Sequence, residues 1–408
     1  MDFVGKKLFD GERIFNAKGR KEMQTDRKFI SYFKLLRWML AVCVLAFVVW
    51  GEGSRALALE DFSYTTDEDS GDATITKYNG SATSVTVPDT LDGHKVVAIG
   101  SDAFKGNTSL QTVTIGNNVT SLGSYAFQSC SNLKTVNLGS GVTSLGSYAF
   151  RYCKNLESIV LPKGIKTIKS FAFVDCTKLA AIEIPKSLTS VGESVFSGCS
   201  SLENVTFEED ITSIPANFMQ GCSGLKEITI PDTVTSIGSS AFLGCSNLAT
   251  VNMSFRVKTV NMYAFRDCSS LKEIKFGKYI NSINTYAFYN VSDLTIYGVK
   301  DTAAESFAAS KGFTFETYTI PATSLEIDKA ELLLLKGRTG SVTATVLPEN
   351  TTDFVVWSSK DDSVVKVDDN GEMSAVELGS TRVVVTVGTL DKTCNVTVVQ
   401  PVEEIQIS

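Results

Sequence analysis

Apolar residues recur along most of this chain with a period of about 23 residues, which is longer than the period of any single helix or strand. One unit places its apolar side chains at Val119, Leu122, Ala126, Phe127, Cys130, Leu133, Val136 and Leu138. The next unit repeats the pattern from Val142 to Leu161. Because a unit of this size cannot bury its own apolar face, the period predicts a solenoid in which each coil packs on its neighbours.

Each unit contains three segments with different patterns. The Leu-x-x-Val-x-Leu segment, as in 133–138, alternates and is rich in β-branched residues, so we expect a short parallel strand. The Val-Thr-Ser-Leu-Gly segment, as in 119–123, predicts a second extended segment that ends at a glycine turn. Between them, Ser-Tyr-Ala-Phe-x-x-Cys has the i, i+3 spacing of a single helical turn.

An Ala-Phe pair, or a close variant of it, marks nine units. Its phenylalanines are Phe104, Phe127, Phe150, Phe173, Phe196, Phe218, Phe242, Phe265 and Phe288, spaced by 23 residues except for steps of 22 and 24 around Phe218. We assign residues 95–298 to these repeats. Residues 59–94 alternate like strands and are expected to cap the N-terminal edge. Residues 299–318, with a helix at Asp301–Lys311, are expected to cap the other edge.

Residues 320–400 have a different pattern, with short alternating strands separated by turn signals such as Asn370-Gly371. This pattern predicts a β-sandwich with Trp357 in its core. Cys394 is the sole cysteine of this region, so a disulfide between its sheets is not expected. Residues 401–408 repeat the spacing of residues 321–328 and are interpreted as the start of a second, truncated domain of this kind.

Residues 1–58 differ from the remainder of the chain. Ten Lys/Arg between residues 6 and 37 precede an apolar run, Trp38–Trp50, and then Ala56-Leu57-Ala58. This order is typical of a secretory signal peptide with an extended basic leader, and the run is short for a membrane span. Met1 and Met23 both remain possible starts. The sequence therefore predicts an exported mature chain that does not span the membrane.

Without residues 1–58 the chain keeps 27 Lys/Arg and 39 Asp/Glu, a net charge of −12. Nucleic acids and anionic membranes need a positive surface, so this charge argues against both as partners.

Seven cysteines occupy the same place in seven consecutive units: Cys130, Cys153, Cys176, Cys199, Cys222, Cys245 and Cys268. Asn107 and Val291 fill this place in the first and last units, so we interpret the set as a buried, reduced, structural ladder. Scattered disulfides between adjacent coils are the alternative, because the protein is predicted to be exported. A metal site is disfavoured because Cys-x-x-Cys and histidine clusters are missing from the sequence.

Signals for catalysis are weak throughout. The single histidine, His94, lies in a polar stretch and is interpreted as a turn residue. Acidic runs at 67–69, 208–210 and 368–369 lack the spaced ligands of a calcium loop and are interpreted as solvated loops. We therefore predict no catalytic residue, no metal and no cofactor.

The residue before each Ala-Phe pair is the best candidate for binding. Aromatic residues fill this position in two groups, namely Tyr125, Tyr148 and Phe171, then Tyr263 and Tyr286, with small residues between the groups. Aromatic side chains in a row on a rigid surface are good anchors for a partner. The alternative is that these rings pack between coils and cover the turn.

The unit at 130–153 resembles the BspA-like class of bacterial leucine-rich repeats, and the resemblance covers about residues 75–316. It implies a right-handed solenoid on a secreted or cell-surface protein, with relatives that act as adhesins. Residues 322–388, with Trp357-Ser358-Ser359 and Gly379-Ser380-Thr381, resemble a bacterial group 2 immunoglobulin-like domain. The expected fold is thus mainly β with short helical turns, a nine-repeat solenoid followed by an immunoglobulin-like β-sandwich.

The resulting functional hypothesis is a non-catalytic adhesin that binds a host extracellular matrix or cell-surface protein, with glycan as a further candidate partner. A structural or glycan-associated envelope component, or the accessory region of a larger secreted enzyme, are the alternatives. The identity of the ligand, the face that binds it, the anchor and the oligomeric state do not follow from the sequence.

Overall fold

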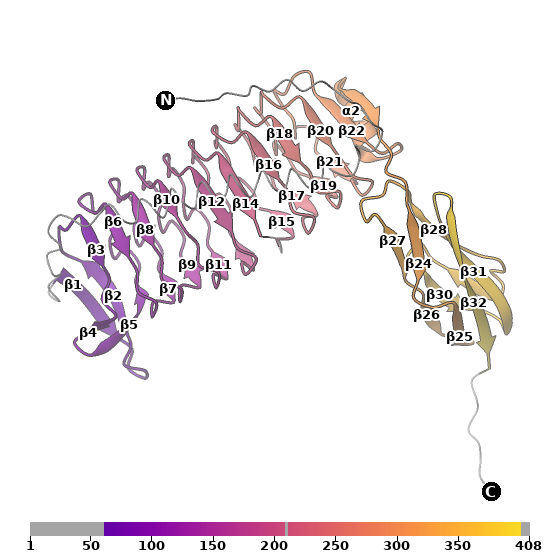
Figure 1. The fold of residues 1–408 in the computed structure, drawn as a ribbon, viewed down its shortest axis with the longest axis horizontal. Helices are drawn as coiled ribbons and strands as arrows, with labels where there is room; N and C mark the ends of the chain where they lie inside the picture. Colours follow the sequence, from indigo (N-terminus) through magenta and orange to yellow (C-terminus); the bar gives the residue numbers. More distant parts are fainter. Residues whose placement is uncertain (1–60, 209–210, 401–408) are drawn as a thin grey trace, which may run out of the picture. The chain divides into compact units, whose positions relative to one another are not determined.

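The computed structural model describes residues 61–208 and 211–400. The predicted signal peptide and the predicted start of a further domain at 401–408 lie outside these residues. The described residues form a mainly β solenoid with one short helix, followed by a separate strand-rich region (Figure 1). The predicted fold class is confirmed.

The solenoid coils contribute two series of parallel strands. The first series is β3 (Ser84–Thr86), β6 (Thr112–Thr114), β8 (Thr135–Asn137), β10 (Ser158–Ile159), β12 (Ala181–Ile184), β14 (Asn204–Phe207), β16 (Glu227–Thr229), β18 (Thr250–Asn252), β20 (Glu273–Lys275), β22 (Thr295–Gly298) and β23 (Thr314–Thr317). The second is β2 (Ala73–Tyr78), β5 (His94–Ile99), β7 (Ser121–Leu122), β9 (Ser144–Leu145), β11 (Thr167–Ile168), β13 (Ser190–Val191), β15 (Ser213–Ile214), β17 (Ser236–Ile237), β19 (Thr259–Val260) and β21 (Ser282–Ile283).

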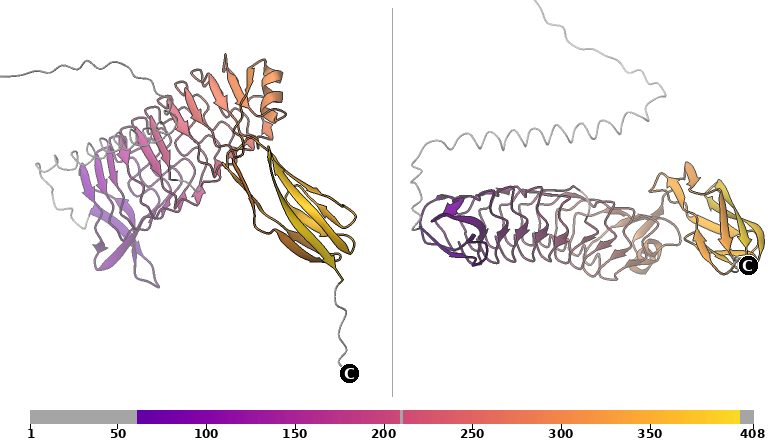
Figure 2. Two further views of the ribbon diagram at one scale, coloured as in Figure 1. Left: turned by 45° about the vertical axis from the view of Figure 1, so that its right-hand side comes forward. Right: turned by 90° about the horizontal axis from the view of Figure 1, so that it is seen from below.

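Paired residues in these strands are one repeat apart. For example, Val113 pairs with Val136, and Leu122 with Leu145, so each apolar position lies directly over its counterpart in the next coil. The two series lie on different sides of the coil (Figures 1 and 2). Their inward side chains and the Ala-Phe pairs form one continuous buried core.

Both ends of the solenoid continue the parallel pairing beyond the nine Ala-Phe units. At the N-terminal end, β2 pairs with β5 and β3 with β6, while β1 (Phe62–Thr66) adds an antiparallel strand to β2. At the other end, the predicted helix is present as α2 (Ala303–Lys311), and Gly312 ends it in the left-handed conformation with φ 69°. The strand β23 then pairs with β22.

The sixth unit departs from the sequence-based alignment. Met219, not Phe218, fills the core phenylalanine position, because its N–H donates to the Ala241 carbonyl as Phe127 donates to Ala149. Phe218 occupies the alanine position, and its ring meets Phe196 at 79° instead of stacking. The steps of 22 and 24 residues therefore reflect an exchange of two neighbouring side chains, while the coil itself keeps 23 residues.

The Ser-Tyr-Ala-Phe-x-x-Cys segment differs from the predicted helical turn. Tyr125 and Ser129 both have φ 60°, so left-handed residues interrupt the segment. The N–H groups of Tyr125, Phe127 and Ser129 donate to the next coil, at Ser147, Ala149 and Arg151. Alternate amides thus bond between coils, which a helical turn would prevent. This turn ladder gives the solenoid a third hydrogen-bonded edge.

The strand-rich region is built from nine strands: β24 (Ser324–Ile327), β25 (Glu331–Leu335), β26 (Thr339–Ser341), β27 (Ala344–Leu347), β28 (Val355–Ser359), β29 (Val365–Val367), β30 (Glu372–Ala375), β31 (Gly379–Val387) and β32 (Leu390–Val399). They form sheets in the orders β25-β32-β31-β28, β26-β30-β29 and β24-β27. Trp357 packs against both buried clusters of this region, as predicted. Asn370 and Gly371 lie in the β29–β30 hairpin turn, also as predicted.

Candidate functional site

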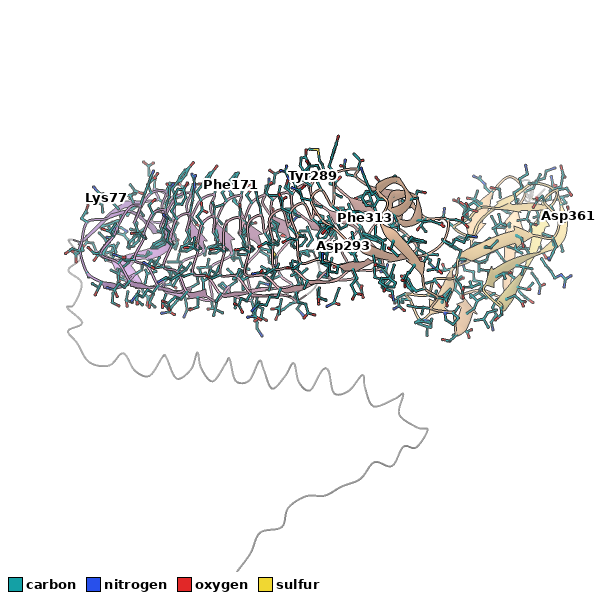
Figure 3. The ribbon with its side chains drawn as sticks, turned by 90° about the horizontal axis from the view of Figure 1, so that it is seen from above. Lys77, Phe171, Tyr289, Asp293, Phe313 and Asp361 are labelled. Atoms are coloured by element: carbon teal, nitrogen blue, oxygen red, sulfur yellow. The ribbon has the colours of Figure 1, made fainter. Side chains whose placement is uncertain are left out.

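The candidate binding residues lie on the turn ladder, where every coil has two left-handed positions. The first precedes the Ala-Phe pair and holds Asp102, Tyr125, Tyr148, Phe171, Ser194, Asn217, Ser240 and Tyr263, with φ between 54° and 66°. The second precedes the cysteine and includes Tyr152, Gly198, Gly221 and Gly244. Figure 3 shows Phe171 and Tyr289, from units far apart in sequence, along the same border of the solenoid.

The first aromatic group forms a continuous stack. The ring centroids of Tyr125 and Tyr148 are 4.9 Å apart and those of Tyr148 and Phe171 4.8 Å apart, with 3° between the ring planes in both pairs. All three side chains are half-buried. The rings therefore pack between coils and also present an edge to solvent, so both interpretations of the aromatic row hold in part.

Two cations lie against this stack. The Lys105 Nζ lies 5.0 Å from the centre of the Tyr125 ring and also pairs with Asp102 at 2.6 Å. The Arg151 guanidinium lies over Tyr148 at 5.3 Å and over Tyr152 at 4.3 Å, and its Nη2 donates to the Tyr152 hydroxyl at 2.7 Å. The Arg151 Nε is buried and has no hydrogen-bond partner among the described residues.

The second aromatic group has a similar composition and a looser geometry. Tyr263 and Tyr286 have centroids 5.8 Å apart at 44°, and Arg266 lies over Tyr263 at 5.0 Å and over Tyr289 at 5.2 Å. Tyr286 and Tyr289 are 47% and 49% exposed. Sequence reasoning missed Tyr152, Tyr289 and the two arginines, although arginine precedes the second left-handed position in both groups.

Small residues separate the two groups. Ser194, Asn217 and Ser240 occupy the first left-handed position there, so Asn217 replaces Ala216, which the sequence alignment placed at this position. Gly198, Gly221 and Gly244 occupy the second. The gap spans three coils at about 4.8 Å each.

Backbone conformation distinguishes the aromatic residues from their small counterparts. The left-handed region costs an ordinary side chain about 1 kcal/mol, whereas Asn, Asp and Gly tolerate it. Ser194, Asn217 and Ser240 show that the coil forms without an aromatic ring at this position. The fold therefore does not require the tyrosines, and ring stacking offsets their strain by about 0.5–1.5 kcal/mol per pair.

The seven repeated cysteines lie inside the solenoid as unlinked thiols. Each Sγ donates to the backbone carbonyl of the core residue of the preceding coil, at 3.0–3.2 Å, as Cys153 does to Phe127. Burial raises the pKa of Cys130 and of Cys245 to about 12, and raises the pKa of Cys153 well above its usual range. These thiols are poor nucleophiles and poor metal ligands, because both roles need the thiolate.

The remaining candidates for chemistry are dispersed. His94 is not a turn residue: it follows the Asp92-Gly93 turn and opens β5 opposite Leu91 of β4 (Thr90–Leu91). Its Nδ1 lies 2.8 Å from the Gly71 carbonyl. Within residues 61–208 and 211–400 there is no group of three metal-ligating side chains. In the same part of the chain, no helix is long and apolar enough to cross a membrane.

The fold and its edge define a class of protein, a parallel β-solenoid recognition scaffold joined to an immunoglobulin-like module. A model of the BspA type leucine rich repeat region matches residues 76–203 and 166–295, which together are more than half of the chain. A model of the bacterial Ig-like domain (group 2) matches residues 321–398. The chain belongs to the BspA-type leucine-rich repeat proteins of bacteria and carries a group 2 immunoglobulin-like domain.

Individual relatives share the fold rather than a described activity. A leucine-rich repeat protein of Bacteroides ovatus is 23% identical, with a TM-score of 0.54 over 64% of this chain and 67% of its own. The leucine rich repeat protein of Treponema pallidum is 25% identical, with a TM-score of 0.42 over 53% of this chain and 91% of its own. An uncharacterized protein of Clostridium acetobutylicum is 38% identical over 82 residues, which are 19% of this chain and 21% of that relative.

Proposed function

We propose that this protein is a non-catalytic recognition module, secreted or attached to the cell surface, that binds a host matrix protein or another cell through the turn-ladder edge. The observation that carries the proposal is the set of aromatic residues held in left-handed backbone at positions where other coils use serine or asparagine. Strained residues that the fold does not need are concentrated at functional sites.

Charge adds a second argument for this edge. Residues 101–189, which include the stacked group, hold nine Lys/Arg and four Asp/Glu, a local charge of +5 in a chain whose total is −7. Aromatic rings beside arginine are also the side chains most enriched among residues that dominate binding energy. The preferred partner is therefore a protein that presents an acidic surface.

Binding to immobilised fibronectin, fibrinogen, collagen, mucin and bacterial cell-wall glycan tests the proposal. The decisive variant changes Tyr125, Tyr148, Tyr263 and Tyr286 to Ser, because Ser194 and Ser240 already occupy this position in the native solenoid. A matched control changes Lys134 and Val160, both exposed on the first strand series, to Ser.

We expect saturable binding to one host protein, lost in the tyrosine variant and kept in the control. Equal binding by the two variants would remove the turn-ladder edge from the proposal. Binding to cell-wall glycan alone would instead favour an envelope component.

A further inference from the structure

The second strand series ends at β21, next to α2. In its sheet the order is β15-β17-β19-β21, so β21 pairs with β19 on one side and with no described strand on the other. A hollow of about 560 Å³ lies here, lined by residues of the last coil and of α2, in the place where the next coil would continue. Figure 1 shows α2 and β21 together at this end of the solenoid.

The pairing of earlier coils identifies the backbone groups that face the hollow. In the second coil, the Thr120 and Leu122 carbonyls accept hydrogen bonds from Thr143 and Gly146 of the following coil. The equivalent carbonyls of the last coil belong to Asn281 and Ile283, and among the described residues no backbone N–H from a following coil reaches them. Two oriented acceptors are therefore open at the edge of the sheet.

Polar side chains complete the lining. Ser282 and Thr285 contribute hydroxyls from the last coil, and Ser306 contributes one from α2. All three are exposed. Asp301, held with φ 62° beside the start of α2, contributes a carboxylate, and its backbone N–H is bonded to Glu305 at 2.7 Å. Ile283 and the buried Phe307 give the hollow an apolar part.

This combination of groups selects the chemistry of the ligand. Asp301 is the one charged side chain of the lining, and its charge is negative, so an anionic ligand is disfavoured. The open carbonyls and the carboxylate accept hydrogen bonds, while the hydroxyls both donate and accept. A ligand with several hydroxyls over an apolar ring face matches this set, and the volume lies within the usual range of about 300–1,000 Å³ for small-molecule sites.

A peptide strand is the other occupant that an open sheet edge can accept. Here the edge is only two residues long, Ser282–Ile283, and α2 lies beside it, so few ladder hydrogen bonds are available to a peptide. We propose that the hollow between β21 and α2 binds a neutral saccharide unit, with the Asn281 and Ile283 carbonyls and the Asp301 carboxylate accepting its hydroxyls. This site is separate from the proposed protein-binding edge.

Saturation-transfer NMR on the full chain tests this site with glucose, galactose, mannose, N-acetylglucosamine and N-acetylgalactosamine, each offered singly. Ser306→Trp fills the hollow from an exposed helix position. Ala309→Trp, also exposed on α2 but outside the lining, is the matched control. Asp301→Asn keeps a residue that tolerates the left-handed conformation while it removes the charge.

We expect signal from at least one sugar, lost in Ser306→Trp, unchanged in Ala309→Trp and weakened about tenfold in affinity by Asp301→Asn, because hydrogen bonds to charged groups are worth about 1.5–3 kcal/mol. The four-tyrosine variant should keep the signal, which separates this site from the proposed protein-binding edge. No signal from any of the five sugars, or a signal that survives Ser306→Trp, would overturn the proposal. So would binding of a hexapeptide strand by a protein that gives no sugar signal.

Discussion

The cysteine ladder leads to a quantitative prediction about thiol reactivity. Treating folded residues 59–408 with Ellman's reagent at pH 8 should leave the seven solenoid thiols unmodified on the time scale in which a free thiol reacts completely. The reagent reacts with thiolate, so the thiolate fraction sets the rate. Complete burial of Cys153 and Cys176 further prevents contact with the reagent.

The magnitude follows from the raised pKa values. An exposed cysteine with a pKa of about 8.5 is roughly one quarter thiolate at pH 8. A pKa of about 12, as for Cys130 and Cys245, leaves a thiolate fraction of about 10⁻⁴. The chemical step alone is therefore slowed about 2,000-fold, before any protection by burial is counted.

The assay compares the folded protein with the same protein unfolded in guanidinium chloride, with no reductant present at any stage. Residues 59–408 contain eight cysteines, the seven of the ladder and Cys394, so about eight equivalents should react after unfolding. Two or fewer equivalents would mean that disulfides join the coils. Rapid modification of several thiols in the folded protein would contradict the burial of the ladder.

Four further predictions concern stability. Because the folded thiol pKa lies above the unfolded value of about 8.5, the thiol contribution to stability is complete below pH 8.5 and is lost as pH rises toward 12, by about 2 kcal/mol per thiol at pH 10. Changing Cys153, Cys176 and Cys199 to Val, the residue found at Val291, should therefore reduce the fall in Tm between pH 8 and pH 10. Gly146→Ala should cost about 3 kcal/mol in denaturant unfolding, since its Cβ would lie 2.4 Å from the Gly123 backbone carbon, whereas Gly164→Ala, with 3.7 Å to its nearest neighbour, should cost under about 1 kcal/mol. Gly371→Ala should lower the stability of the immunoglobulin-like domain by about 2 kcal/mol, because φ is 80° and the Cβ would meet the Trp357 indole at 2.8 Å. The exchange Phe218→Ala with Met219→Phe should change the free energy of unfolding by less than about 1.5 kcal/mol, while Met219→Ala alone should cost about 2–5 kcal/mol.

The repeat made the solenoid predictable because one apolar residue per position recurs in register. Side chains spaced by 23 residues must meet in adjacent coils, and strand pairs such as Val113 with Val136 follow directly. The turn between the strands was less predictable. Ala126 and Phe127 share a core face in a helical turn and also in the observed ladder, so apolar spacing does not distinguish the two conformations.

A clue to the left-handed positions was nevertheless present in the sequence. The residue before the Ala-Phe pair varies among Asp102, Asn217, Ser194 and tyrosine, and Asp and Asn are enriched in that conformation. The exchange at Phe218 hid one member of this set. The β21 hollow had no comparable signal, because it depends on where α2 packs against the last coil.

The separation between core and edge explains how one fold can carry different recognition surfaces. Core positions are fixed by contact with the coils above and below, and Phe150 stacks at 5.3 Å on Phe127 and on Phe173. At the turn ladder the coils are joined by backbone hydrogen bonds, which Tyr148 and Ser194 both make through their N–H groups. The side chain at this position is therefore free to change without loss of a coil-to-coil bond. Selection for a partner can act on these residues while the solenoid keeps its spacing, so the aromatic groups and the glycine-lined gap between them are the part of the surface in which specificity resides.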